Sequence, residues 1–480
     1  SIFIFYKIKL PNAKFTGYGY DNNGDFMLKD WLITPARFND GHFAMYSNLN
    51  LDDSSNAISD YEINLSIPQN YELTTNLNKN ARIGSKFTLK GEKHSQVVIY
   101  LSQKSDFRSF ILPHLKIETN IKDNNLNEIK KALLIKQITE YAEEHIGKYP
   151  HASIVVSQTD YERNPFYGLN QLPSFISPFP DDFVFEIKFL KTYLNNFLKN
   201  SLTLDERKDN WIYDAIQVYT MMKYIDEYYP NMKMMGSVAK LKILKSFNLV
   251  NLDFNEQYSY FYMLMARKNL DQPIGESKEK LIKFNEQIAS KYRAGLSLNY
   301  LDHYLENNIV PSSIEQFYLL NQEKKVKESD FESILKNKTE ADINWFFKTI
   351  IHSRDIVDYK FSEVTKTNDS ITFTIKNKTN TTVPIPVYGL ENNQVVFKKW
   401  YSEISNDSTF TIPRKNINKI VLNYENEVPE FNLRNNWKSL KGFYPNNRPF
   451  KFVLMKDLED PYYNQILYVP SLSYTLYDGI

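Results

Sequence analysis

Four polar residues in the middle of the chain are its candidates for chemistry. Lys191, Thr192 and Asn195 lie in one short segment, and Asp214 follows after eighteen intervening residues. Residues four apart on a helix share a face, so Lys191 and Asn195 would point into the same space. A catalytic zinc ion takes three imidazole or carboxylate ligands and keeps one position for water. The four residues offer an ammonium, a hydroxyl, an amide and one carboxylate, and Thr192 cannot act as the general base that activates a water. Their types therefore predict no metal.

The rest of the sequence offers no recognisable catalytic or cofactor motif. The chain has no cysteine, which excludes disulfides, thiol catalysis and thiolate metal ligands. No two of its seven histidines are four residues apart. They are His42, His94, His114, His145, His151, His303 and His352. No Ser/His/Asp arrangement and no glycine-rich phosphate loop is visible, so we predict no cofactor.

The spacing of the four residues resembles that of the gluzincin zinc peptidases of the aminopeptidase N class. That family has H-E-x-x-H on one helix and, eighteen residues later, a Glu within W-x-x-E-G. Here Lys191 to Asn195 stands in place of H-E-x-x-H, and Asp214 lies within Trp211 to Ala215. An alternative register, Phe185 to Phe189 with Glu186 in second place, also lacks His and misses the spacing by six residues. Both registers predict that the zinc ligands are lost.

Two further motifs extend the resemblance over much of the chain. Gly168, Leu169 and Asn170 stand where the family has G-x-M-E-N, a strand edge that binds the peptide, and Asn170 replaces the Glu that would hold an amine. Tyr292 lies in a Y-x-x-G pattern, where the family has the tyrosine that stabilises an oxyanion. The resemblance implies that the first three residues are remnants of a peptide-binding edge and that Tyr292 is a remnant of the oxyanion-stabilising tyrosine.

Each of these residues also has a simpler structural interpretation. Tyr292 could be a half-buried helix tyrosine, and Lys191 and Asn195 could form a solvated helix face. Asp214 could form a salt bridge with Lys191 and so fill the former metal position, while Glu186 would lie at the surface.

The composition is that of a folded protein with no affinity for nucleic acid. The 480 residues include 58 Lys and Arg against 57 Asp and Glu, a net charge of +1, which predicts no nucleic-acid partner. The length of 480 residues is enough for two to four domains, and the 42% of hydrophobic residues is ordinary for a folded protein. No run of about 18 apolar residues occurs, so we expect no membrane-spanning helix.

The hydrophobic pattern predicts a multidomain α+β protein. Period-two alternation in 1–118, as at Tyr61, Ile63, Leu65 and Ile67, indicates an N-terminal β domain. Helical periodicity predicts a mostly helical domain over 119–357. The resemblance implies that this domain is thermolysin-like and contains the degenerate site. Its helices include Asn125 to Ile146, with Ile129, Leu133, Ile138 and Tyr141 on the apolar face, and Glu279 to Leu305. Alternation returns in 358–428 and predicts a small β-sandwich, with Pro384 and Pro386 on an edge strand.

The last segment, 429–480, is rich in aromatic residues and prolines and lacks clear periodicity. It resembles the segment that joins a peptidase-like part to a carboxy-terminal barrel in outer-membrane proteins of the Bacteroidota. The resemblance implies an outer-membrane protein whose barrel follows Ile480, with the globular part in the periplasm or, alternatively, at the cell surface. The N-terminal β region resembles the β domain of the same peptidase family, which normally starts earlier, so that resemblance implies residues in front of Ser1. The exposed aromatic residues of the segment 429–480 would suit a protein or lipid interface. They are Tyr462, Tyr463, Tyr468 and Tyr474.

Two functions follow from the sequence. The first is a catalytically inactive peptidase-like protein that binds or scaffolds outer-membrane or other envelope proteins, with a peptide in the former active cleft as a further candidate ligand. The alternative is an enzyme, a peptidase-like hydrolase with an unrecognised or non-zinc site.

Overall fold

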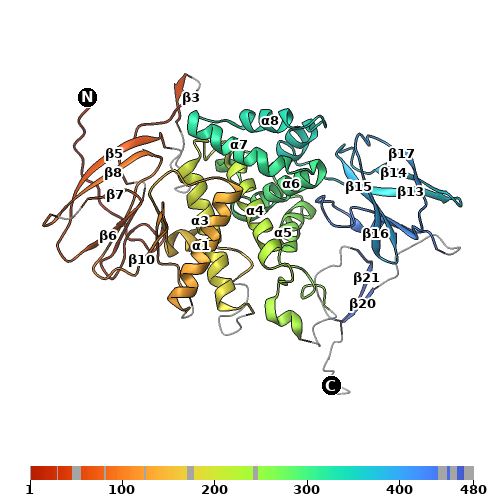
Figure 1. The fold of residues 1–480 in the computed structure, drawn as a ribbon, viewed down its shortest axis with the longest axis horizontal. Helices are drawn as coiled ribbons and strands as arrows, with labels where there is room; N and C mark the ends of the chain where they lie inside the picture. Colours follow the sequence, from red (N-terminus) through yellow and green to blue (C-terminus); the bar gives the residue numbers. More distant parts are fainter. Residues whose placement is uncertain are drawn as a thin grey trace, which may run out of the picture.

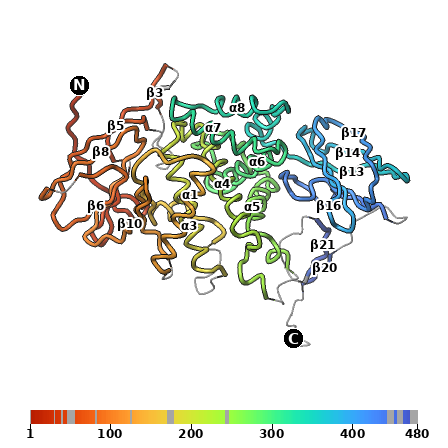
Figure 2. Tube along the Cα trace, viewed as in Figure 1, coloured from red at the N-terminus to blue at the C-terminus, as the bar shows by residue number. Residues whose placement is uncertain are grey.

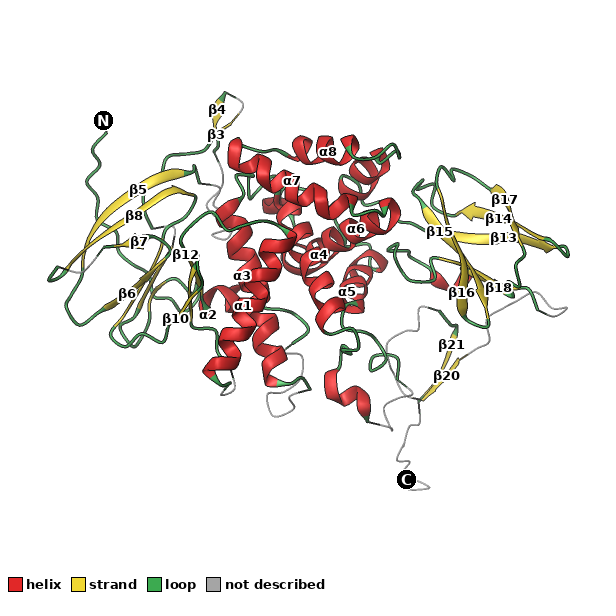
Figure 3. Cartoon of the chain, viewed as in Figure 1, coloured by secondary structure: helices red, strands yellow, loops and turns green. Residues whose placement is uncertain are grey.

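The structure is a computed structural model that describes residues 2–29, 31–39, 41–45, 56–80, 83–123, 126–169, 178–241, 247–441, 451–454 and 462–469. Along the chain, β sheets come first, helices follow, and β sheets return (Figure 1). The tube in Figure 2 shows the two β parts at opposite ends of the long axis, with the helices between them. Figure 3 shows the same division by secondary structure. The predicted α+β class and the order of its parts are confirmed.

The N-terminal part packs two sheets around a core of its own. Their orders are β1-β2-β9-β6 and β5-β8-β7. In β5, side chains alternate between half-buried and exposed, as the period-two pattern predicts. The strands are β1 (Gly19–Tyr20), β2 (Phe26–Lys29), β3 (Phe38–Asn39), β4 (His42–Phe43), β5 (Ser59–Ser66), β6 (Glu72–Thr75), β7 (Asn78–Lys79), β8 (Lys86–His94) and β9 (Val98–Ser102).

A third sheet joins the N-terminal part to the helices. Its order is β10-β11-β12, from Arg108–Ile111, Lys116–Thr119 and Ser153–Val156. β11 and β12 are parallel, and the first long helix connects them. The predicted boundary after residue 118 therefore falls inside β11. Leu115 and Ile117 already belong to the core of the helical centre, so that centre begins before the helical periodicity does.

The helical centre buries a continuous apolar core. An apolar stripe runs along α3 at helical spacing, and its residues Phe183, Ile187, Leu190, Leu194 and Phe197 are all buried. The helices are α1 (Glu128–His145), α2 (Gln158–Arg163), α3 (Asp181–Ser201), α4 (Asn210–Tyr228), α5 (Glu256–Arg267), α6 (Ser290–Leu305), α7 (Ile309–Glu323) and α8 (Glu328–Asn337). Among the described residues, no helix is both long and apolar enough to span a membrane.

Two helix predictions need correction. On α1, Ile138 and Tyr141 are buried as expected, but Ile129 and Leu133 are 71% and 61% exposed. The first turns of α1 therefore present apolar side chains to solvent. The predicted helix from Glu279 to Leu305 is not continuous. A 3-10 turn, Lys278–Lys280, and a π-helical segment, Asn285–Ala289, precede α6.

The C-terminal part is the predicted sandwich, built from sheets β13-β14-β17 and β16-β15-β18-β19. β19 lies beyond residue 428, so the sandwich extends into the predicted tail. The prediction that Pro386 lies on an edge strand is wrong, because β15 pairs with β16 and with β18. Pro386 is tolerated because pairing with β18 begins only at Val387. The strands are β13 (Tyr359–Lys366), β14 (Ser370–Asn377), β15 (Ile385–Glu391), β16 (Gln394–Tyr401), β17 (Ser408–Pro413), β18 (Lys419–Leu422) and β19 (Trp437–Ser439).

The described part of the tail adds a parallel pair, β20 (Lys451–Leu454) and β21 (Gln465–Tyr468). Tyr463 and Tyr468 are exposed, as predicted. Tyr462 is half-buried and lines a cavity together with residues of β18 and β19. Tyr474 lies outside the described residues.

Candidate functional site

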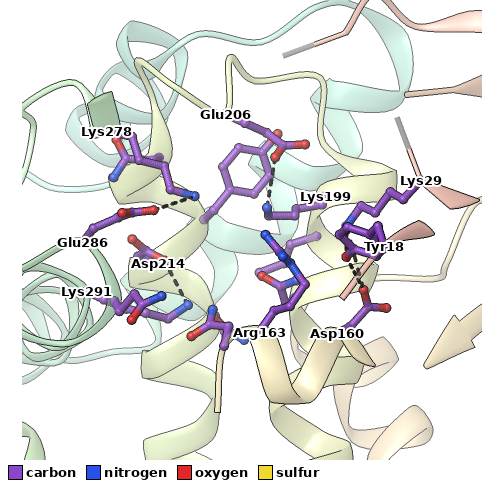
Figure 4. Close-up of a pocket in the computed structure, with 17 residues that line it drawn as sticks. Tyr18, Lys29, Asp160, Arg163, Lys199, Glu206, Asp214, Lys278, Glu286 and Lys291 are labelled. Carbon is purple, nitrogen blue, oxygen red and sulfur yellow. Dashed lines mark hydrogen bonds and ion pairs between the residues drawn. The ribbon is translucent and has the colours of Figure 1, made fainter. Parts of the chain in front are cut away.

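Helices α3 and α4 bring two of the four predicted residues, Asn195 and Asp214, into one cleft, and Lys191 and Thr192 are not among the residues that line it. The two helices are antiparallel neighbours, and Nε2 of Gln217 on α4 donates a hydrogen bond of 2.7 Å to the backbone oxygen of Lys191 on α3. Asn195 and Asp214 line a common cleft. Figure 4 shows Asp214 and the charged residues around it. The eighteen-residue spacing thus correctly predicts two helices facing one site.

Lys191 is a buried ammonium held by three oxygens. Its Nζ donates to the backbone oxygen of Asn164 at 2.7 Å, to Oδ1 of Asn164 at 2.9 Å and to the backbone oxygen of Pro165 at 2.7 Å. Burial lowers its pKa, the nearby Lys291 lowers it further, and Asp214 opposes both. The residue is 4% exposed, so it is not part of a solvated helix face.

Asp214 forms its ion pair with Lys291 of α6, at 3.1 Å, and not with Lys191 as the sequence suggested. The reason is the position of α6. Asp214 and Lys223 of α4 pair with Lys291 and Asp302 of α6, in the same order along both helices, so the two helices run side by side in the same direction. This places Lys291, whose side chain is 5% exposed, directly beside Asp214.

Thr192 and Asn195 offer no general base. The hydroxyl of Thr192 donates to the backbone oxygen of Lys188 at 2.8 Å, one helical turn back, and the side chain is buried. Asn195 is half-buried, and its Nδ2 donates to Oδ1 of the neighbouring Asn196 at 3.2 Å.

These residues do not fit a zinc ion. Zinc needs three neutral imidazole or anionic ligands within about 2.3 Å, whereas the four positions supply one carboxylate, and Lys291 already neutralises it. In the described part of the chain, no group of three or more His, Asp or Glu side chains is placed to hold a metal ion.

The rest of the cleft is lined by side chains of opposite charge that lie close to one another. Lys199 pairs with Glu206 at 3.0 Å, and Lys278 approaches Glu286 at 3.8 Å. Burial lowers the pKa of Lys278, with Lys199 as the next cause. The cavity volume is about 70 Å³, well below the ~300–1,000 Å³ of small-molecule sites. A cavity of this volume has room for a few waters but not for a small-molecule ligand.

The N-terminal part contributes to one wall of this cleft (Figure 4). The hydroxyl of Tyr18 donates to Oδ1 of Asp160 at 3.0 Å, and Lys29 lies 3.8 Å from the same oxygen. The guanidinium of Arg163 stacks 4.7 Å from the centre of the Tyr18 ring. These contacts reach the cleft from the sheet β1-β2-β9-β6.

Tyr292 is a core residue. It is buried, its ring meets that of Tyr258 edge to face at 4.8 Å, and the backbone of Tyr167 forms a hydrogen bond with its hydroxyl. Burial raises its pKa, and the residue is not among those that line the cleft. The structural interpretation of Tyr292 is therefore favoured, although the residue is fully buried and not half-buried.

The predicted peptide-binding edge is not a strand. Gly168 lies in a turn after α2, where an added Cβ would be 2.3 Å from Oε1 of Gln257 on α5. A larger residue there would require the side-chain amide of Gln257 to move. Leu169 is buried in the core, and neither residue lines the cleft. Asn170 lies outside the described residues.

Glu186, from the alternative register, is buried and not at the surface as predicted. Its carboxylate accepts hydrogen bonds from the hydroxyls of Tyr224 and Tyr229. Burial raises its pKa. Sequence reasoning also missed Lys291 and Lys278, because each comes from a segment distant in the chain. The only signal was that Lys291 directly precedes Tyr292 in the Y-x-x-G pattern.

Comparisons with known proteins bear on the fold of the chain. No family model matches the sequence, and no curated protein matches it. Solved structures do match. One is aminopeptidase A of Legionella pneumophila in complex with aspartic acid, with a TM-score of 0.55 and 11% identity, over 78% of this chain and 44% of that chain. The chain thus spans less than half of that protein's length, and at this identity the likeness concerns the fold alone. The chain has an M1-like aminopeptidase fold.

Proposed function

We propose that this chain is a catalytically inactive aminopeptidase-like protein that works by binding other molecules. Its fold is similar to that of an aminopeptidase, but fold alone does not imply activity. The proposal depends on the chemistry of the cleft.

The observation that carries the proposal is the pair of lysines at the former metal position. The ammonium of Lys191 is fixed by three oxygens, and that of Lys291 neutralises Asp214. Two cations replace one dication there, so a metal ion would meet repulsion where it needs ligands. Without a Lewis acid or a general base at these positions, a water in the cleft stays a poor nucleophile.

Zinc analysis and a peptidase assay on the full chain test this. After incubation with zinc and dialysis, we expect much less than one zinc per chain and no hydrolysis of aminoacyl reporter substrates above the zinc-only control. Hydrolysis abolished by Asp214→Asn but retained in Asp407→Asn, an exposed control on the sandwich, would refute inactivity and place the activity in this cleft. Hydrolysis that survives both changes would also refute it, in favour of an enzyme with another site.

A restoring design tests whether only the zinc ligands are lost or whether the helix geometry that would hold them is lost as well. Lys191→His, Thr192→Glu, Asn195→His and Asp214→Glu together rebuild the ligand set on the same two helices. Lys291→Met must accompany them, because its ammonium would compete for the new carboxylate. We expect measurable zinc affinity in the five-residue variant and none when Asn195 is left unchanged.

We propose further that the binding role is in the cell envelope, with envelope proteins as partners. The exposed apolar side chains of Ile129 and Leu133 on α1, and of Phe452 and Leu467 on the tail strands, support a protein or lipid contact. Fractionation of native cells should place the protein with the outer membrane, and protease shaving should tell the periplasmic from the surface-exposed arrangement. Recovery in the cytoplasm would end the envelope proposal and leave the inactive cleft untouched.

A further inference from the structure

An exposed apolar segment precedes the first sheet. Residues 2–9 read Ile-Phe-Ile-Phe-Tyr-Lys-Ile-Lys and lie outside every helix and strand. They form no backbone hydrogen bond with any other described residue. All eight side chains are exposed, and six of them are apolar or aromatic. Figure 1 shows the segment leading away from the N-terminal sheets to the end of the chain. A contiguous exposed surface of this kind marks an interaction site.

The exposure of the segment alternates as it does along a strand that has one covered face. Phe3 and Phe5 are 82% and 96% exposed, whereas Ile4, Tyr6 and Ile8 are between 45% and 57% exposed. Alternate residues of a strand point to opposite faces, so the even-numbered side chains share one face. Isoleucine, phenylalanine and tyrosine are also residues that strands favour. The segment therefore has the pattern of a strand but no neighbouring strand among the described residues.

Strand β5 offers an open edge. The sheet order β5-β8-β7 leaves β5 at one end, and within the described ranges it pairs with β8 alone. Every second residue of β5 therefore points its N–H and C=O groups away from β8. Natural edge strands are commonly protected by lysine or proline, and the eight residues of β5 include neither. The other described edge strands of six residues or more, β13, β16 and β17, each contain one or the other.

The segment and β5 are complementary when they pair antiparallel. Placing Lys7 opposite Glu62 also places Lys9 opposite Asp60, on the exposed face of β5. The apolar face of the segment then lies opposite the half-buried face of β5. The apolar pairs are Ile4 with Leu65, Tyr6 with Ile63 and Ile8 with Tyr61. A parallel arrangement that brings the lysines to the same two acids would leave residues 2–5 beyond the start of β5.

The charges also alternate across the extended sheet. Nζ of Lys90 on β8 lies 3.3 Å from Oε2 of Glu62, and Lys7 would flank Glu62 from the open side. Opposite charges on neighbouring strands stabilise a sheet, and like charges destabilise it. The charge pattern therefore favours this register over one in which the lysines face each other.

We propose that residues 2–9 of one copy of the chain add as a strand to the open edge of β5 in a second copy. Within one chain the segment does not pair with β5. A twofold arrangement uses the same two surfaces of each protomer, so the dimer contains the pairing twice. Backbone hydrogen bonds to the edge supply affinity, and the alternate side chains supply specificity.

Sedimentation velocity on the full chain tests the proposal through a charge exchange. We expect a dimer at about 10 µM, since protein interfaces of standard size span micromolar to picomolar affinity. Lys7→Glu and Glu62→Lys each place like charges opposite each other at both pairings, so each variant alone should dimerise about tenfold more weakly. An equimolar mixture of the two variants restores opposite charges at both pairings and should recover the affinity of the unchanged chain. Lys14→Glu makes the same change at an exposed lysine outside the segment and is the matched control.

The outcomes separate a second copy from other occupants of the edge. A chain that stays monomeric at about 100 µM overturns the proposal. If hydrogen exchange then finds residues 2–9 protected in the monomer, the segment is covered within its own chain. The proposal is equally overturned if Lys7→Glu weakens the dimer no more than Lys14→Glu, or if a mixture of the two folded variants dimerises no better than either alone. Lys7→Glu remains informative even if Glu62→Lys, which loses its pair with Lys90, folds poorly.

Discussion

Asp214→Asn should destabilise the helices around the cleft, because Asp214 is the counter-ion of buried lysines. The change keeps the shape of the side chain and removes its charge. Lys291, with its side chain 5% exposed, then loses its ion-pair partner, and Lys191 loses the one carboxylate that opposes the lowering of its pKa.

The magnitude follows from the distance and the burial. Two unit charges 3.1 Å apart attract by about 5 kcal/mol at an effective dielectric constant of ~20. Removing one partner of a buried pair typically costs about 3–5 kcal/mol. Because the Asp214 side chain is 19% exposed and water can approach Lys291 from that side, we expect the lower end, about 3 kcal/mol.

Hydrogen exchange measured by mass spectrometry suits this test, because a chain with several domains does not unfold in one step. Peptides from α3, α4 and α6 should exchange about 100-fold faster in Asp214→Asn, since each ~1.4 kcal/mol corresponds to a factor of ten. Adding Lys291→Met should recover most of the protection, since the uncompensated cation is gone. Asp407→Asn is the control. Exchange unchanged in the single variant, or equally fast in the double variant, would refute the view that Asp214 holds these helices together.

Two further predictions concern other parts of the core. His94 and His151 stack 3.9 Å apart, and burial, followed by His151, lowers the pKa of His94 to about 3. An unfolded histidine takes up a proton below about pH 6.5, whereas His94 in the folded chain does so only near pH 3. The contribution of His94 to the free energy of unfolding is therefore complete above pH 6.5. As the pH falls from 6.5 toward 3, the free energy of unfolding decreases by about 5 kcal/mol at most. Melting temperatures from pH 7.5 to 4 should fall less steeply in His94→Gln; parallel curves would contradict this. Gly295→Ala should destabilise by about 2 kcal/mol despite the better helix propensity of alanine, because its Cβ would be 2.3 Å from Cγ1 of Val218. A melting temperature equal to or above that of the unchanged chain would show that the helices can move apart there.

Local patterning was sufficient to predict the class of fold, and a resemblance to a known family located the candidate site. The apolar stripe on α3 and the alternation in β5 and β14 depend on the period of a helix or a strand, which the sequence displays directly. The spacing from Asn195 to Asp214 placed both residues on facing helices through its resemblance to a known family. The absence of zinc ligands at these positions is also a property of residue types alone.

Contacts between distant segments were not predictable in this way. The partner of Asp214 is Lys291 because α6 runs parallel to α4, and Glu186 is buried because two tyrosines of the α4 end cover it. Neither contact produces a periodic hydrophobic pattern in the segment that carries the residue.

Dependence on distant segments also explains the wrong predictions for α1 and for Pro386. Ile129 and Leu133 are as apolar as Ile138, yet no element of the described part of the chain covers their side chains. Pro386 looks like an edge residue, yet β18 pairs with β15 one residue further on. The sequence by itself determined which segments form helices and strands and which chemistry the four central positions lack. Only the tertiary structure decided which charges meet, because an ion pair depends on the distance between helices far apart in the chain, and local periodicity carries no information on that distance.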